Sequence, residues 1–140
     1  MSDRVNGFVV VALTRDEARV WLTGVESGAR PERIVAPHDQ DRHHHVREAQ
    51  HHAGHDTDHD QATFYESIAV AVSPATEILL VGHGKGKADA MLKLTQFLER
   101  KHPGVATKVV GAIDADVEAL SPNQILSLAR DWFDRYHEFL

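Results

Sequence analysis

The chain has 140 residues, of which 42% are hydrophobic and 26% charged, enough for one domain with a buried core and too few for two domains of ordinary size. It has no cysteine, which excludes disulfides and thiolate chemistry. The formal net charge is −6 when the 11 histidines are counted as neutral. This charge argues against a general nucleic-acid binder but is compatible with local basic patches. The start at Met1 lacks the pattern of a signal peptide, and the apolar run Phe8 to Leu13 is too short for a membrane span. We therefore expect a cytoplasmic protein with no membrane association.

The N-terminal part of the chain predicts three short strands joined by polar turns. Residues Gly7 to Leu13 are apolar and rich in β-branched side chains, which is typical of a strand buried on both faces. Residues Glu17 to Thr23 alternate with a period of two, and Glu32 to Ala36 form a third strand. Short turns between consecutive strands predict an antiparallel meander.

The segment from Pro37 to Asp60 breaks this pattern. It holds eight of the eleven histidines, several aspartates and only one large aliphatic residue, Val46. This composition offers too little apolar area to offset the entropy lost when a chain is ordered. We therefore predict a flexible, histidine-rich insertion at residues 37–60 within a single domain that spans residues 1–140.

The second half of the chain alternates between helical and strand patterns. Apolar residues at Phe64, Ile68 and Val72 repeat every four positions, which predicts a helix with one core face. Ser121-Pro122 is a helix-start signature, with serine as the cap and proline at the first helical position. The predicted elements are helix 61–72, strand 77–81, helix 88–102 (ended by Pro103-Gly104), strand 108–113 and a terminal helix from residue 121 onward.

Three meandering strands followed by α-β-α-β-α is the element order of ribonuclease H-like folds. Residues Phe8 to Leu22 resemble the opening strand pair of the middle domain of archaeal and eukaryotic peptide-chain release factors. Residues Ile78 to Lys87 resemble that domain's later strand and glycine-rich turn, and bacterial standalone relatives, called translational machinery proteins, share the arrangement. The resemblance implies an α/β, ribonuclease H-like mixed sheet with helices on both faces. It also implies the ribosome, rRNA or tRNA as a partner, and it leaves the oligomeric state open.

The chain departs from true release factors at the segment between its third strand and first helix. In those proteins this excursion carries Gly-Gly-Gln, whereas here Gln40, Gln50 and Gln61 do not follow a glycine pair. Without two glycines the backbone does not easily adopt the positive φ angles that present the glutamine. Peptidyl-tRNA hydrolysis by that route is therefore not expected. Our first hypothesis is a non-catalytic, ribosome- or RNA-associated, translation-related protein.

The histidine spacing supports a second hypothesis, metal binding. His51, His55 and His59 fall at i, i+4 and i+8, and His52 pairs with His55 at i, i+3. On a helix, neutral imidazoles at these positions line one face and suit Zn²⁺ or Ni²⁺. The simpler alternative is a solvated loop of biased composition that binds such metals adventitiously and requires no cofactor.

A glycine-rich turn follows the fourth predicted strand: Gly82, His83, Gly84, Lys85, Gly86 and Lys87. Its place between a strand and a helix favours anions, because backbone N–H groups and the helix dipole point there. The spacing is not that of a Walker A motif. The turn is thus either an RNA phosphate contact or a structural tight turn. Arg42 and Arg47 add cations that could meet phosphates in the first half of the histidine-rich segment.

Catalytic constellations are sparse in this sequence. A ribonuclease H-type nuclease binds divalent metal ions through several carboxylates. The carboxylates near the ends of predicted strands in this sequence are Asp16, Asp114, Asp116 and Glu118. An RNA or peptidyl-tRNA hydrolase of unrecognised mechanism is therefore the third hypothesis. Four aromatic residues are predicted to pack in the core rather than to form a binding platform: Trp21, Trp132, Phe133 and Tyr136.

Overall fold

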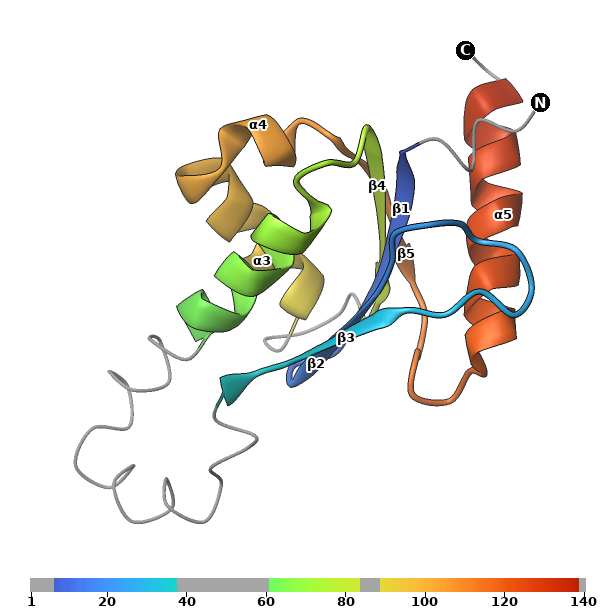
Figure 1. Cartoon of the computed structure of the whole chain (residues 1–140), viewed down its shortest axis with the longest axis horizontal. Helices are drawn as coiled ribbons and strands as arrows, with labels where there is room; N and C mark the ends of the chain where they lie inside the picture. The colour runs from blue at the N-terminus through green and yellow to red at the C-terminus, as the bar shows by residue number, and fades with distance from the viewer. Residues whose placement is uncertain (1–6, 38–60, 84–88, 139–140) are drawn as a thin grey trace.

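A five-stranded mixed sheet forms the centre of the computed structural model, which describes residues 7–37, 61–83 and 89–138 (Figure 1). The strands are β1 (Phe8–Leu13), β2 (Glu17–Trp21), β3 (Glu32–Val35), β4 (Glu77–Gly82) and β5 (Val109–Asp114). The helices are residues 61–72, α3 (Ala90–Lys101), the short α4 (Pro103–Ala106) and α5 (Pro122–Glu138). No helix in these three ranges is long and apolar enough to cross a membrane.

The strands lie in the order β3-β2-β1-β4-β5. The first three form the predicted antiparallel meander, with Val11 opposite Val20 and Ala18 opposite Ile34. The last two strands run parallel to β1 on its other side, with Val10 opposite Leu79. The predicted α/β class with a mixed sheet is therefore confirmed, and the arrangement is consistent with a ribonuclease H-like fold.

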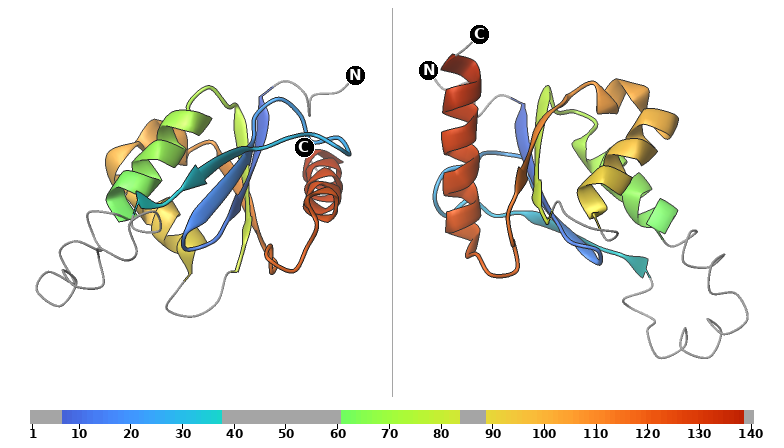
Figure 2. Two further views of the ribbon diagram at one scale, coloured as in Figure 1. Left: turned by 60° about the horizontal axis from the view of Figure 1, so that its bottom comes forward. Right: turned by 180° about the vertical axis from the view of Figure 1, so that it is seen from behind.

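Helices cover both faces of the sheet, as Figure 2 shows: α5 lies on one side, and α3 and residues 61–72 lie on the other. Val9 and Val11 of β1 pack in one core with Phe64 and Leu94. The alternate β1 residues face the other core, which contains Phe133. Every residue of β1 is buried, which explains why this strand has an uninterrupted apolar sequence rather than an alternating one.

The predicted elements agree with the structure to within about two residues at their ends, the usual uncertainty of helix and strand boundaries. The start of α5 is fixed by a capping box, in which Ser121 Oγ accepts from Gln124 N at 3.1 Å and Gln124 Oε1 accepts from Ser121 N at 2.8 Å. One element, α4, was not predicted. Pro103 was expected only to end a helix, but it also begins α4, because proline is well suited to a first helical position.

The predicted burial of the aromatic residues is confirmed for Trp21, which is 0% exposed, and Phe133, which is 5% exposed. Trp132 is half-buried and packs against the core on the α5 side of the sheet. It stacks on half-buried Tyr136 with ring centroids 4.7 Å apart and an interplanar angle of 14°. The aromatic residues of α5 therefore pack with one another and with the sheet.

The buried Tyr65 makes the stability of the fold depend on pH in the alkaline range. The residue is 6% exposed, and its ring contacts that of Phe97 with centroids 5.7 Å apart. Burial raises the pKa of its phenol above 10.0. Because the folded-state pKa is the higher one, the stabilisation is present below pH about 10 and is lost as pH rises through the folded-state value. We expect the free energy of unfolding of the wild type to fall more steeply above pH about 10 than that of Tyr65→Phe, as measured by urea unfolding. Parallel losses in the two proteins would contradict this assignment.

Candidate functional site

The carboxyl ends of β4 and β5 lead into helices on opposite faces of the sheet. After β4 the chain enters α3, whose Met91 and Leu94 pack in one core. After β5 it enters α5, whose Ile125 and Leu126 pack in the other. In open α/β sheets such a divergence leaves a crevice outside the strand ends, and ligands bind there.

A cleft of about 310 Å³ lies at this position, close to the lower end of the range of about 300–1,000 Å³ that is typical of small-molecule sites. Its apolar surface comes from three buried residues, Leu13, Ala90 and Val117. Its polar lining comes from Thr14, Arg15, His83, Asp116 and Glu118. We refer to these eight residues as the carboxyl-end cleft.

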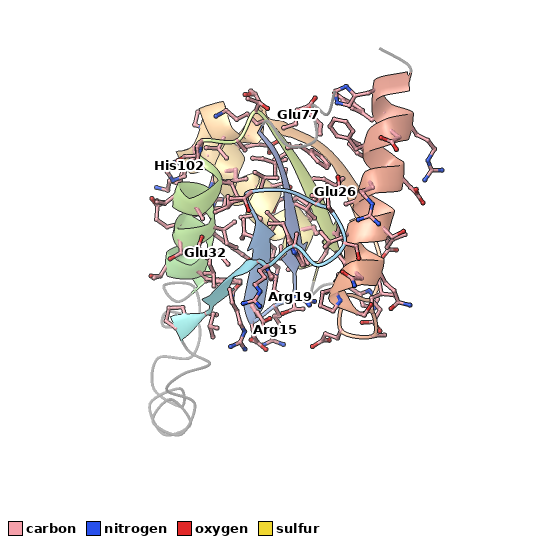
Figure 3. The ribbon with its side chains drawn as sticks, turned by 45° about the vertical axis from the view of Figure 1, so that its right-hand side comes forward. Arg15, Arg19, Glu26, Glu32, Glu77 and His102 are labelled. Carbon is pink, nitrogen blue, oxygen red and sulfur yellow. The ribbon has the colours of Figure 1, made fainter. Side chains whose placement is uncertain are left out.

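The turn between β1 and β2 places Arg15 at the cleft. Thr14 Oγ1 accepts hydrogen bonds from Glu17 N at 3.1 Å and from Asp16 N at 3.3 Å, and Thr14 N donates to Glu17 O at 2.8 Å. These bonds use the threonine hydroxyl to close the turn. The exposed Arg15 is therefore the group of this turn that a ligand would meet, and Figure 3 shows it at the same end of the sheet as Arg19.

The connection from β5 to α5 supplies the carboxylates. Ala115 N donates to Gly82 O at 2.8 Å, which continues the sheet into this connection. Asp116 Oδ1 accepts from Glu118 N at 3.2 Å, and Arg19 of β2 donates to Val117 O at 3.2 Å. Two distant strands thus hold the loop in place, with Asp116 and Glu118 exposed and Val117 buried beneath them.

Gly82 is a buried strand residue rather than part of an open turn. A β-carbon at this position would lie 2.6 Å from the carbonyl oxygen of Leu13, closer than real contacts allow. The absence of a side chain at Gly82 is therefore explained by the close approach of β1 and β4. His83 follows it as an exposed residue at the cleft.

The other predicted site residues lie outside the described residues. They are Gly84, Lys85, Gly86 and Lys87 of the glycine-rich turn, Arg42 and Arg47, and the histidines His51, His52, His55 and His59. Their roles in binding RNA phosphate or metal stay predictions. Within residues 7–37, 61–83 and 89–138, no group of three His, Cys, Asp or Glu side chains is placed to hold a metal ion.

The structure places two of the four carboxylates near predicted strand ends at the cleft. Asp116 and Glu118 line the carboxyl-end cleft together with His83, whereas Asp16 and Asp114 are not among its lining residues. Arg15 was missed as a site residue. The available signal was its position in the polar turn directly after a buried strand, at the sheet end where ligands bind.

A larger groove of about 920 Å³ lies between β3 and residues 61–72. Its lining includes Ile34, Ala71 and Phe97, together with Val70, which is 62% exposed. In the sequence, β3 precedes and residues 61–72 follow segment 38–60, which lies outside the described residues.

A solved structure of another protein has a similar fold. No protein-family model matches the chain, and no curated protein matches it. The crystal structure of Thermoplasma acidophilum Pelota is 17% identical with a TM-score of 0.53, over 83% of this chain and 30% of Pelota. Archaeoglobus fulgidus Pelota is 12% identical with a TM-score of 0.48, over 94% and 38%. The archaeal translation termination factor aRF1 is 12% identical with a TM-score of 0.36, over 93% and 39%.

The chain thus spans between 30% and 39% of the length of these proteins. The likeness to Thermoplasma Pelota is one of fold. At that level it confirms the predicted resemblance to a release-factor-like domain.

Proposed function

We propose that this chain is a non-catalytic, translation-related protein that associates with the ribosome or with RNA. The observation that carries the proposal is the fold shared with Thermoplasma Pelota over 83% of the chain. The resemblance of Phe8 to Leu22 and of Ile78 to Lys87 to the middle domain of peptide-chain release factors points in the same direction. Because fold alone does not determine function, the proposal requires a direct binding test.

The sequence supports a role without hydrolysis. The segment between β3 and residues 61–72 lacks the Gly-Gly-Gln motif of true release factors. At the carboxyl-end cleft, the hydroxyl of Thr14 is engaged in its own turn, with its Oγ1 3.1 Å from Glu17 N. A hydroxyl held in this way is poorly placed to be activated as a nucleophile by His83 acting as a base, since a nucleophile must hydrogen-bond to its base.

Any attraction of this chain to RNA must come from a local group of positive charges. The net charge of −6 repels polyanions at long range, so that attraction depends on cations gathered at one place. Arg15 is a described cation at the cleft. Lys85 and Lys87 follow β4 in the sequence and are the predicted phosphate contacts near the same end of the sheet.

Sedimentation of the full chain with purified ribosomes tests the proposal. We expect the protein to pellet with ribosomes and to stay in the supernatant without them. Replacing both Lys85 and Lys87 by alanine is expected to reduce the pelleted fraction, whereas replacing the exposed Arg100 and Lys101 of α3 removes the same charge elsewhere and is expected to leave the fraction unchanged. Equal losses in both double variants would show that only total charge matters.

Metal binding by the histidine-rich segment is a separate proposal that rests on the spacing of His51, His52, His55 and His59. Titration of the intact chain with Zn²⁺ or Ni²⁺ should show saturable binding that is lost when these four histidines are replaced by glutamine. Binding of equal strength in the variant would remove this proposal. Repeating the ribosome sedimentation with Zn²⁺ would show whether the two activities are linked.

A further inference from the structure

We propose that this chain forms a two-fold symmetric dimer in which the outer edge of β5 pairs antiparallel with β5 of a second copy. The strand order β3-β2-β1-β4-β5 makes β3 and β5 the two edges of the described sheet. In the right-hand view of Figure 2, β5 lies beside β4 and next to α5, and no other described segment crosses it. Dimer formation does not depend on the proposed function and is measured without ribosomes or RNA.

The two edges of the sheet differ in their protection against pairing. An open edge presents a row of backbone N–H and C=O groups, and native proteins guard it with short strands and charged side chains. The strand β3 has four residues, of which Glu32 and Arg33 are exposed. The strand β5 has six residues, and those from Val109 to Ile113 include neither a charged residue nor a proline. The edge of β3 is therefore guarded, whereas that of β5 is suited to accept a further strand.

The outer side of β5 forms an apolar strip with part of α5. Val110 and Ile113 are half-buried and Ala112 is exposed. On the α5 side, Trp132 covers Gly111 so closely that a β-carbon there would lie 2.3 Å from the indole ring. Trp132 itself is only half-buried. Because aromatic residues are enriched in the cores of protein–protein interfaces, this strip suits a protein partner.

An irregularity at the start of β5 limits where a second copy can pair. Residues 78 and 79 of β4 are consecutive, but their partners on β5 are Val109 and Gly111, so Val110 is an extra residue between them. A bulge of this kind disrupts the strand ladder locally. The regular part of β5 therefore begins at Gly111.

The hydrogen bonds on the β4 side select Ala112 as the centre of the pairing. Ala115 N donates to Gly82 O at 2.8 Å, so the N–H of Ala115 points toward β4. Because the backbone groups of successive strand residues point to opposite sides, those of Ile113 also point toward β4 and those of Ala112 point away from it. In an antiparallel pair about Ala112, its N–H and C=O bond to the same groups of the second copy.

This register brings complementary groups together. Residues that lie opposite each other in an antiparallel pair share one face, with β-carbons about 4.5–5.5 Å apart. Ile113 of the second copy therefore lies opposite Gly111, which has no side chain, and next to Trp132. The charged ends also match, because Lys108 before one strand lies opposite the exposed Asp116 after the other. A parallel pairing would instead bring like charges together.

Sedimentation equilibrium of the full chain at several concentrations tests the proposal. We expect the mass to rise from that of one chain, 15.6 kDa, to twice this value. The expected dissociation constant is on the order of micromolar, at the weak end for specific interfaces. A single-chain mass at every concentration up to about 100 μM would overturn the inference and leave the β5 edge to a strand of another protein.

Two substitutions at Ala112 are designed to break the dimer without breaking the sheet. Ala112→Pro removes the N–H at the centre of the pairing, and because this N–H points away from β4 the internal ladder is retained. Ala112→Lys places two ammonium groups opposite each other and leaves the backbone unrestricted. We expect both variants to be monomers at concentrations where the wild type is a dimer, with circular dichroism confirming that they are folded. A dimer in either folded variant would overturn the inference.

Val35→Pro is the matched control on the other edge of the sheet. Ala36 N donates to Asp16 O at 2.8 Å, so the backbone groups of Ala36 point toward β2 and those of Val35 point outward. This variant therefore removes an outward N–H from β3 as Ala112→Pro does from β5. We expect it to form the dimer as the wild type does. Loss of the dimer in this folded control would place the interface at β3 and overturn its assignment to β5.

Cross-linking tests the centre of the pairing. The chain has no cysteine, so a single introduced thiol reports only on its own neighbours. Ala112→Cys places the two thiols opposite each other across the symmetry axis, within reach of a short bifunctional maleimide. Ala62→Cys places an exposed thiol on helix 61–72 as the control. We expect a cross-linked dimer only with Ala112→Cys, and equal cross-linking of both variants would overturn the inference.

A charge exchange tests the direction of the strands. Lys108→Asp and Asp116→Lys each place like charges opposite each other and are expected to weaken the dimer by up to about tenfold, because the two-fold axis repeats each contact. The double variant exchanges the two charges and is expected to regain most of the affinity. Lys108 Nζ also donates to Ser73 O at 2.8 Å, a bond that Lys108→Asp and the double variant lose alike. A double variant that dimerises no better than the single variants would overturn the antiparallel pairing.

Discussion

Replacing Trp21 by alanine is expected to lower the free energy of unfolding by about 3–5 kcal/mol, the usual cost of removing a large buried aromatic side chain. Trp21 is 0% exposed and is among the largest fully buried side chains of the described residues. Its Nε1 also donates to Ala29 O at 3.0 Å, so the substitution leaves a partly buried carbonyl without this donor. Domains of this size have a free energy of unfolding of about 5–15 kcal/mol. Urea unfolding followed by circular dichroism should therefore show the loss of much of the stability.

Two comparisons make the Trp21 prediction specific. Trp21→Phe retains most of the ring volume but not the bond to Ala29 O, so we expect an intermediate loss. Trp132→Ala removes a side chain that is only half-buried and is expected to cost less than Trp21→Ala, because less apolar area returns to water. A change within about 1 kcal/mol for Trp21→Ala would contradict the described packing of β2 against the α5 side.

Replacing Gly82 by alanine is expected to cost about 1–3 kcal/mol, the usual penalty for an added group in a tightly packed core. The new β-carbon would lie 2.6 Å from Leu13 O and 3.4 Å from Met91 Cγ. The first neighbour is backbone within the β1–β4 ladder, where Leu13 is paired with Gly82 itself. Relief of the contact would require the two strands to separate locally. Urea unfolding of the variant measures the cost directly.

Gly104→Ala is the matched control for Gly82→Ala. Gly104 lies in α4, and a β-carbon there would meet nothing within 4 Å. Because alanine has a higher helix propensity than glycine by about 1 kcal/mol, this variant is expected to be as stable as the wild type or more so. If Gly82→Ala instead left stability unchanged and weakened only RNA binding, Gly82 would be a contact residue rather than a packing residue.

Much of the fold could be predicted because local and tertiary preferences agree. The uninterrupted apolar run of β1 is explained by burial on both faces. The serine–proline start of α5 is explained by its reciprocal cap with Gln124. The exception is α4, a four-residue helix that is too short to show hydrophobic periodicity.

The cleft could not be predicted because its parts are far apart in the sequence. Arg15 and Asp116 come together only because β4 lies between β1 and β5, and because α3 and α5 cover opposite faces of the sheet. The sequence shows that a carboxylate follows a strand, but not which face the next helix covers. Gly82 illustrates the same limit, since the nearby Leu13 carbonyl comes from a strand 69 positions earlier.

Sedimentation of the full chain with ribosomes over a series of salt concentrations is the most direct test of a translation-related, ribosome- or RNA-associated role. We expect the protein to pellet only when ribosomes are present. We also expect the pelleted fraction to fall as salt rises from about 50 to 200 mM, since phosphate contacts release counterions. A pelleted fraction equal to that of a ribosome-free control at every salt concentration would contradict ribosome association.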